Sequence, residues 1–259
     1  MKRYLKILYL NSKAVLLSTL EYRVAYIFRV ARIFLSFGLT YLSLNILFLR
    51  TESLGGWSKL EVFLIYGVYM FVTSFVDFFC GDSLAEIPSL VKEGGLDMVL
   101  TKPLDSQFII SFKDTHPGNM YRIFIALIIF YYATTLLRGE IYFQNVFFGF
   151  FFILSAIVIY YSLLLLIASL SFYILEGSLG EVFENFMSLS RYPVDIFPRG
   201  LRVILTVVPA IFLVTVPSRV ILGKYSGFDW LAFPVAIFLF YLSRKCFLSA
   251  LRSYTSAGG

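Results

Sequence analysis

Carboxylates that share one face of a helix are the residues of this sequence best placed to do chemistry. Glu181 and Glu184 are three residues apart, so a helix would bring them to one face, with Asn185 beside them and Glu176 a little over one turn earlier. Such a group could line a polar transport path or hold a cation near a membrane. The solvated face of an interfacial helix would show the same pattern, and we favour that interpretation because an ionised pair inside a bilayer is costly.

Signatures of an enzyme are mostly absent from the sequence. Its one histidine, His116, precedes Pro117 in a polar stretch and has no second histidine with which to form a metal site or a triad. Cys80 and Cys246 are too few for a disulfide framework or a four-ligand metal site. There is no P-loop, no G-x-S-x-G element and no basic tract of the kind that follows a nucleic acid. We therefore expect no catalytic, cofactor or metal site in this chain, and no nucleic-acid partner.

The composition is that of a membrane protein. Of the 259 residues, 59% are hydrophobic and 15% are charged, and the mean hydropathy is +0.82, whereas soluble domains carry about 25% charged residues. The 29 Phe and 18 Tyr residues suit lipid contact and interfacial anchoring. The first residues lack a compact apolar region followed by a cleavage site, so we expect no removable signal peptide. Asp77 and Asp82 flank the end of an apolar run and are interpreted as boundary residues.

Hydropathy predicts an all-α, six-span helical bundle. Residues 1–28 are basic and amphipathic, and we expect them to form an N-terminal helix in the membrane interface rather than an extension of the first span. The chain from 29 to 259 is predicted to be one transmembrane domain, with spans at residues 30–49, 60–79, 119–137, 141–174 and 228–247 and a further span before the last of these. A helix over the fourth run would be ~50 Å long, so it must tilt, break or project.

Residues 176–224 allow two interpretations. Hydropathy selects 201–222 as the fifth span, although Pro209 and Pro217 interrupt it. Residues 178–193 could cross instead if their polar face lined a protein interior, and 198–224 would then be a re-entrant hairpin. Both interpretations give six crossings. Lys and Arg are concentrated in the N-terminal segment, in the loop from 80 to 122 and in the tail, which places both termini and that loop in the cytoplasm.

The loop after the second predicted span contains a structured segment, residues 83–107, which we call the elbow. Pro88 suits the first position of a helix, so we predict a short helix over about Pro88 to Glu93, ended by Gly94 and Gly95 as a C-cap. Pro103 holds Lys102 extended. We expect exposed apolar side chains on this compact elbow, including a patch formed by Leu96, Met98, Val99 and Leu100. An ordinary interfacial loop is the alternative.

Two stretches resemble a family of bacterial ABC-2 type permeases. GGLDMVLTKPL, from Gly94 to Leu104, is similar to that family's stretch of the form GELDLLLLRPL after the second span. RYPVDIFPRGLRVILTVVPAIFLVTVPSRVILG, from Arg191 to Gly223, is similar to its Pro-containing turn, P-x-x-L-R step, P-x-x-x-x-x-x-P-x-R region and closing Gly. Gly95 stands where the family usually has Glu or another polar residue.

The resemblance implies the membrane half of an ABC transporter. Such permeases pair as dimers of identical or related chains and bind a separate ATPase subunit that uses ATP and Mg, so this chain would hydrolyse no ATP itself. The elbow would be the coupling helix that enters a cleft of the ATPase, through Ile87, Pro88, Leu90, Val91, Lys92, Leu96 and Lys102. The family favours 178–193 as the fifth span and 198–224 as the re-entrant segment. The translocation path or outer gate would then involve Glu181, Glu184, Asn185, Pro209, Pro217 and Arg219.

We therefore expect a multi-pass protein of the bacterial cytoplasmic membrane, in contact with lipids. An amphipathic or lipid-like substrate is compatible with the aromatic-rich fourth span and the few intramembrane charges, and export follows from the resemblance alone. Two rival hypotheses are a membrane-embedded enzyme that uses Glu176, Glu181 and Glu184, and a non-catalytic assembly protein of the membrane. A secondary transporter is disfavoured because the sequence has no inverted repeat of short, broken spans.

Overall fold

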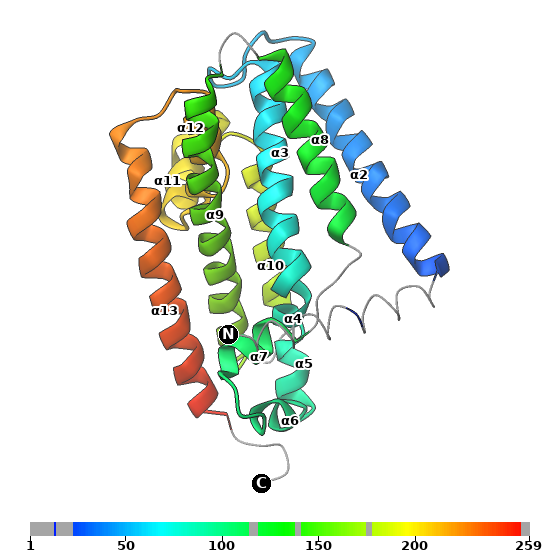
Figure 1. The fold of residues 1–259 in the computed structure, drawn as a ribbon, viewed down its shortest axis with the longest axis vertical. Helices are drawn as coiled ribbons and strands as arrows, with labels where there is room; N and C mark the ends of the chain where they lie inside the picture. Colours follow the sequence, from blue (N-terminus) through cyan, green and yellow to red (C-terminus); the bar gives the residue numbers. More distant parts are fainter. Residues whose placement is uncertain (1–12, 14–22, 114–118, 138–140, 175–177, 255–259) are drawn as a thin grey trace.

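The computed structural model describes residues 13, 23–113, 119–137, 141–174 and 178–254. Within these ranges the chain is helical and has no strand, apart from one isolated bridge between Leu54 and Trp57. Long helices run side by side along the longest axis of the molecule, and four short helices between residues 82 and 111 gather at one end (Figure 1). The prediction of an all-α membrane protein is confirmed. The predicted interfacial helix over 1–28 lies almost entirely outside the described residues.

Five helices form the bundle, and each corresponds to a predicted span. They are α2 (Arg23–Phe48), α3 (Lys59–Val76), α8 (Met120–Leu136), α9 (Phe143–Leu170) and α13 (Ala232–Arg252). All but α8 include a segment long and apolar enough to cross a membrane, and α8 is a shorter apolar helix. Helix α9 is continuous over 28 residues, or about 42 Å. The length of the fourth apolar run allows a break in the helix, and no break occurs within α9.

Helix α9 is the centre of the bundle and packs against α13, α12 (Thr215–Ile221) and α3. Gly149 lets α12 come close, because a Cβ atom at this position would collide with Ile221. Phe152 is fully buried and contacts the rings of Trp230 and Phe233, with centroid distances of 5.4 and 4.8 Å. Three buried serines of α9 each donate a hydrogen bond to a carbonyl of their own helix, so their hydroxyls do not weaken the core.

Helix α3 continues beyond the predicted end of the second span. A π-helical turn (Asp77–Gly81), α4 (Asp82–Ala85) and α5 (Ile87–Lys92) follow it, and together they form one helical segment, Lys59–Lys92, of 34 residues. Ser58 and Glu61 form a capping box at its start. At its other end, Gly94 has a φ of +73° and terminates the helix. The predicted short helix with Pro88 near its start is therefore present as α5, but it is joined to the span.

The elbow is completed by α6 (Leu96–Leu100) and α7 (Ser106–Ser111), which lie with α4 and α5 at one end of the bundle (Figure 1). We call this the elbow end. Helix α9 finishes near it, whereas α13 begins at the opposite end (Figure 1). The chain between them must therefore return along the length of the bundle.

Between α9 and α13 the chain returns through short helices and 3₁₀ turns. Helix α10 (Ser178–Met187) and a 3₁₀ turn (Ser188–Arg191) cover the half nearer the elbow. Two helices follow, α11 (Arg199–Val207) and α12. Three further 3₁₀ turns lie before α11, between α11 and α12, and after α12: Val194–Ile196, Ala210–Phe212 and Gly227–Leu231. Helix α11 and the stretch 210–221 are bent by 78° relative to each other, which is the geometry of a broken span or a re-entrant loop. Residues 201–222 are therefore not one straight helix, and Pro209, which has no backbone N–H, stands at the break.

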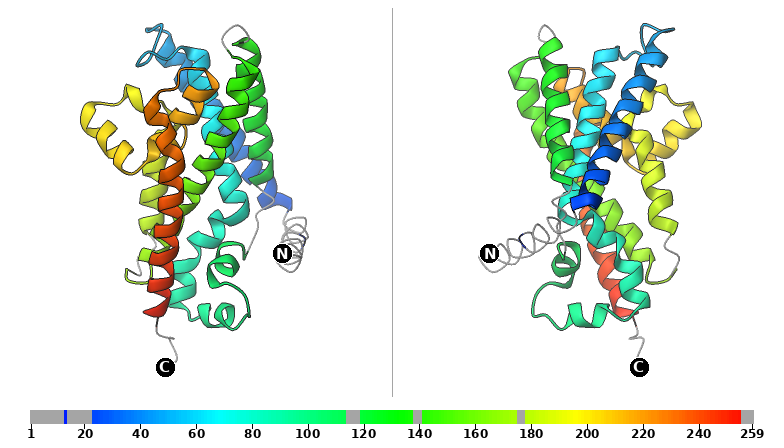
Figure 2. Two further views of the ribbon diagram at one scale, coloured as in Figure 1. Left: turned by 60° about the vertical axis from the view of Figure 1, so that its left-hand side comes forward. Right: turned by 90° about the vertical axis from the view of Figure 1, so that its right-hand side faces the viewer.

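Helices α11 and α12 belong to the half of the bundle opposite the elbow. Lys224, just after α12, pairs with Glu61 in the first turn of α3. Gly223 lies against Asn145 in the first turn of α9. Both views in Figure 2 show α11 projecting sideways from the bundle. The number of crossings stays a prediction, because α10 alone, with 10 residues, is too short to span a bilayer core of about 30 Å.

Candidate functional site

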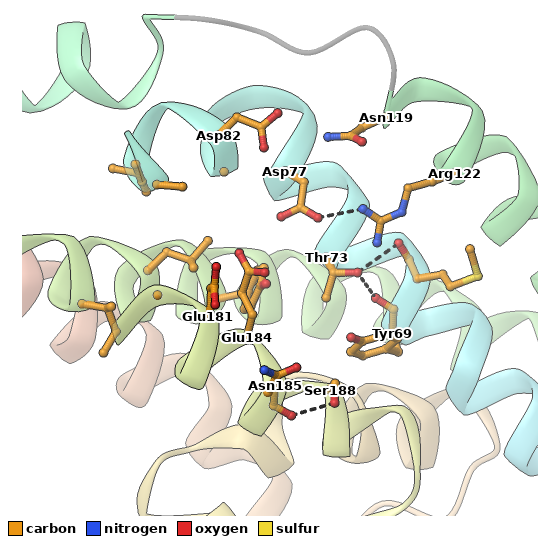
Figure 3. Close-up of a pocket in the computed structure, with 18 of the residues that line it drawn as sticks. Tyr69, Thr73, Asp77, Asp82, Asn119, Arg122, Glu181, Glu184, Asn185 and Ser188 are labelled. Atoms are coloured by element: carbon orange, nitrogen blue, oxygen red, sulfur yellow. Dashed lines mark hydrogen bonds and ion pairs between the residues drawn. The ribbon is translucent and has the colours of Figure 1, made fainter. Parts of the chain in front are cut away.

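A cavity of about 870 Å³ lies between α2, α3, α8, α9 and α10. Its wall extends from Tyr66 in the middle of α3 to Pro88 at the start of α5, so it reaches the elbow. Exposed side chains, among them Arg32, Glu181 and Asn185, take part in the lining, and the cavity is therefore open to the outside. Figure 3 shows polar groups from three helices directed into it.

The α3 wall carries an ion pair that spacing along the sequence did not indicate. Asp77 begins the π-helical turn, and its carboxylate accepts a hydrogen bond from Arg122 of α8 at 2.9 Å. About a quarter of each side chain is exposed, so the pair is shielded more than a surface pair is. Asp82 lies one turn farther along the same wall. Both acids had been interpreted as span-boundary residues, and 45 residues separate Asp77 from its partner.

The α10 wall carries the acids that the sequence singled out. Glu181, Glu184 and Asn185 all line the cavity, as their spacing of three and four residues predicts for one helix face. Figure 3 shows Glu181 and Glu184 across the cavity from Asp77 and Asp82. Both glutamates are exposed, as expected for a solvated face, yet they also face a cavity, so the two interpretations of this group are not exclusive. Glu176 lies outside the described residues.

The inner part of the cavity is aromatic. Phe37 of α2 stacks on Tyr66 of α3 with centroids 6.3 Å apart, and Tyr66 stacks on Tyr69 at 6.4 Å. The guanidinium of Arg191 lies 5.9 Å from the centre of the Tyr69 ring, at a distance that suits a cation–π contact. Tyr160 of α9 completes this part of the lining. The cavity thus has a charged outer part and an aromatic inner part.

Three of the residues predicted for the path or gate lie elsewhere. Arg219 of α12 forms hydrogen bonds of 2.7 and 2.9 Å with Asp195 and lies 3.6 Å from Asp229, which is fully buried. Trp57, before α3, donates a hydrogen bond to the same Asp195. Pro209 and Pro217 are buried in the bent segment at this end. The structure therefore divides the predicted group into a cavity toward the elbow and an ionic cluster at the opposite end.

The elbow is tied to α9 and α13 by a compact polar network. Asp105 caps α7 through the N–H of Phe108, and it also accepts a hydrogen bond of 2.7 Å from Arg244 of α13. Arg244 donates a second bond to Gln107, and Gln107 donates to the hydroxyl of Tyr161 in α9. The hydrogen bond from Arg244 lowers the pKa of Asp105 below its usual value, and the N–H of Phe108 contributes. This network was not predicted, because its members are far apart in the sequence.

Comparison with known proteins decides the family. A model of the ABC-2 family transporter proteins matches residues 34–258. This chain belongs to that family. No curated protein and no solved structure matched it. As an ABC-2 family protein, the chain is the transmembrane permease subunit of an ABC transporter, a non-catalytic subunit that works with an ABC ATPase.

The elbow of this ABC-2 permease differs in one respect from the expectation of exposed apolar side chains. Ile87 and Leu96 are both fully buried, so they belong to the core beneath the elbow and offer no surface to a partner. The expectation is wrong for these two residues because α7 packs against α4 and α6 and closes the elbow on itself, which brings both side chains into the main hydrophobic core. The other predicted coupling residues keep some exposure: Pro88, Leu90 and Val91 are half-buried, and Lys92 and Lys102 are exposed.

Proposed function

We propose that this permease exports an amphipathic substrate through the cavity, and that a separate ATPase drives it by binding the elbow. The continuous helical segment Lys59–Lys92 supports the proposal. One end of this segment forms the outer surface of the elbow, and its middle forms a wall of the cavity. A displacement of α5 would therefore reach Asp82 and Asp77 through about one to four helical turns, with no flexible loop between them.

The elbow is attached so that it can pass force to the bundle. The network of Asp105, Gln107 and Arg244 joins α7 to α9 and α13. Movement of the elbow would shift α9 and α13 together with α3, since buried, close-packed contacts transmit strain. Nucleotide binding by the ATPase would then favour one of two arrangements of the cavity walls.

The bent segment α11–α12 would serve as the gate at the other end of the path. Arg219 fastens it to Asp195 and Asp229, and Lys224 fastens it to Glu61 of α3. Ion pairs between separate elements can be broken and remade as the elements move, which suits a gate. In this proposal, 178–193 is the fifth span and 198–224 is the re-entrant segment.

Orientation and assembly follow from charge and family. We place the elbow end, with its lysines and both termini, on the cytoplasmic side of a bacterial inner membrane. A second permease chain, identical or related, would complete the path. Helix α2 exposes much apolar surface, including Ile27, Phe34, Leu35 and Ile46, which suits contact with lipid or with that second chain.

Isolation of the chain with its bound partners tests the proposal. The tagged chain, purified from its own membranes in mild detergent, should carry a stoichiometric ATP-binding subunit. The variant K92E/K102E reverses two exposed charges of the elbow and should lose at least nine-tenths of that subunit. The control K59E reverses one exposed charge at the far end of the same helical segment, and should retain the subunit. Leu96→Asp is unsuitable, because a charge at a fully buried position would unfold the elbow.

Recovery of the chain without any ATP-binding protein would overturn the proposed coupling. Equal loss of the subunit in K59E and in K92E/K102E would instead show that the elbow is not where it binds.

A further inference from the structure

We propose that the cavity binds its substrate through a cationic headgroup, such as a quaternary ammonium or a protonated amine. The proposal rests on the function proposed above, because it names the substrate class of the same path. It depends on three observations: the distribution of charge around the cavity, a buried tyrosine that faces it, and the separation of its carboxylates.

Charge around the cavity is uneven. Seven charged side chains line it: Arg32, Asp77, Asp82, Arg122, Glu181, Glu184 and Arg191. Arg122 is engaged by Asp77, and Arg191 donates to the carbonyl of Ser188 and lies over an aromatic ring. No hydrogen bond or ion pair joins the carboxylate of Glu181 or Glu184 to another described residue, and Figure 3 shows both across from Asp77 and Asp82. Four carboxylates thus share the cavity with three guanidinium groups, two of which have the contacts just described, so the lining carries a net negative charge and attracts cations.

Tyr160 gives an independent indication of a ligand. Its side chain is only 5% exposed and lines the cavity, and its hydroxyl makes no hydrogen bond with another described residue. This hydroxyl borders the open cavity, so it is available to form a hydrogen bond with a group that enters. The rings of Tyr66, Tyr69 and Tyr160 line the same space, and an ammonium group is attracted to aromatic faces.

The separation of the carboxylates favours an organic cation over a metal ion. Among the described residues, no group of three or more His, Cys, Asp or Glu side chains is close enough to hold a metal. A cavity of about 870 Å³ has room for a molecule of drug size. Ile33, Phe37 and Met70 add apolar lining from α2 and α3. A substrate whose headgroup lies between the carboxylates would thus place its apolar tail against these two helices.

Two probes of equal shape and opposite charge test the proposal. We would measure equilibrium binding of tetraphenylphosphonium and of tetraphenylborate to the full chain in nanodiscs of zwitterionic lipid, with empty nanodiscs as the background. The cation should bind saturably and the anion should not exceed the background. In E181Q/E184Q the dissociation constant for the cation should rise at least tenfold, and in Tyr160→Phe several-fold. The control E52Q/E93Q removes the same charge at exposed positions outside the cavity and should bind like the wild type.

Saturable binding of the borate in preference to the phosphonium would overturn the proposal, as would unchanged cation binding in E181Q/E184Q. The comparison of the two probes uses the wild-type chain, so it decides the matter even where a variant fails to fold. No ATPase takes part in this assay. Failure of the cation to bind would therefore count against the cationic substrate and not against the binding of an ATPase at the elbow. Loss of the ATPase from the purified chain would count against the coupling and not against cation binding.

Discussion

At the scale of single residues, the clearest functional contrast is between two kinds of charge. Glu181 and Glu184 are exposed and face an open cavity, whereas Asp229 is fully buried beside Arg219. An exposed carboxylate can exchange water for a ligand at little cost, and a buried one must keep its cation. We therefore expect substitutions at the first pair to change binding and substitutions at the second to change stability.

Removal of Arg219 should destabilise the fold, because Asp229 would remain as a buried carboxylate without its cation. Breaking such a pair typically costs about 3 kcal/mol, so Arg219→Ala should lower the Tm of the detergent-solubilised chain by roughly 6–12 °C. Arg199→Ala provides the control, because Arg199 is exposed on the neighbouring helix, and it should change the Tm by less than about 2 °C. Equal effects of the two substitutions would contradict a structural role for the cluster.

Residue types and spacing predicted one wall of the cavity and missed the other. The i, i+3, i+4 spacing of Glu181, Glu184 and Asn185 placed them correctly on one face of α10. Asp77 and Arg122 lie 45 residues apart, and no periodicity relates positions on two different helices. A pair of this kind becomes visible only when α3 and α8 pack together. The burial of Leu96 was missed for a similar reason, since it depends on how α6 packs against α7 and the core.

At the scale of elements, the elbow is attached to the bundle through one residue, Asp105, that makes two interactions. Asp105 both caps α7 and binds Arg244 of α13. Its pKa is lowered in the folded protein. The stability contributed by this charge is therefore fully present above the unfolded pKa of about 3.9, and it is lost as the pH falls through the lower, folded value.

Asp105→Asn should reveal this contribution, because Asn keeps the cap and removes only the charge. At pH 6 the variant should be less stable than the wild type by up to about 1 kcal/mol, since the pair is partly exposed. The difference in Tm between the two proteins should shrink as the pH falls below about 4. The melting curves of both proteins, recorded from pH 3 to pH 7, provide the measurement. A difference that stays constant with pH would show that the charge on Asp105 does not anchor the elbow.

Long, continuous apolar runs predicted the positions of most helices well. Apolar runs that polar residues or prolines interrupt did not predict where the helices begin and end. Each of α2, α8, α9 and α13 corresponds to a long, continuous apolar run, and the four helices have 17 to 28 residues. The end of the second span was placed at residue 79 because polar residues follow it, yet the helix continues to Lys92. Its backbone hydrogen bonds are satisfied within the segment, so a change of side-chain polarity does not end it. The 78° bend before α12 arises from packing against α9 and α3 as well as from Pro209.

At the scale of the whole molecule, the functional parts are separated along the long axis. The cavity extends from the middle of the bundle to the elbow at one end, and the Asp195–Arg219–Asp229 cluster lies toward the other end. This separation is what a transporter needs, since energy must enter at one membrane surface and a barrier must open at the other. The family, the helical class and the elbow were all recognisable in the sequence. The cavity was not, because its lining comes from helices that are far apart in the sequence, from Arg32 to Arg191.

The separation predicts opposite sidedness for two exposed residues. In a chain whose native cysteines are replaced by Ser, a single cysteine at Lys102 should react with a membrane-impermeant maleimide only in inside-out vesicles. A single cysteine at Glu52, in the turn before α3, should react only in intact, right-side-out cells or spheroplasts. Both positions are exposed, so permeabilised membranes serve as the control in which both react. Reaction of both residues from the same side would contradict the proposed topology.

The π-helical turn at Asp77–Gly81 gives the segment from Lys59 to Lys92 a property that a uniform α-helix would lack. A π turn holds more residues than an α turn, so converting one into the other rotates everything beyond it by about 100° and shifts it by about 1.5 Å along the axis. A Cβ atom at Gly81 would lie only 2.9 Å from the Asp77 carboxylate, so a larger residue there would displace that side chain from its present position. A change of this turn, driven by a twist of α5, would therefore reorient the carboxylates of Asp77 and Asp82 relative to the other walls of the cavity.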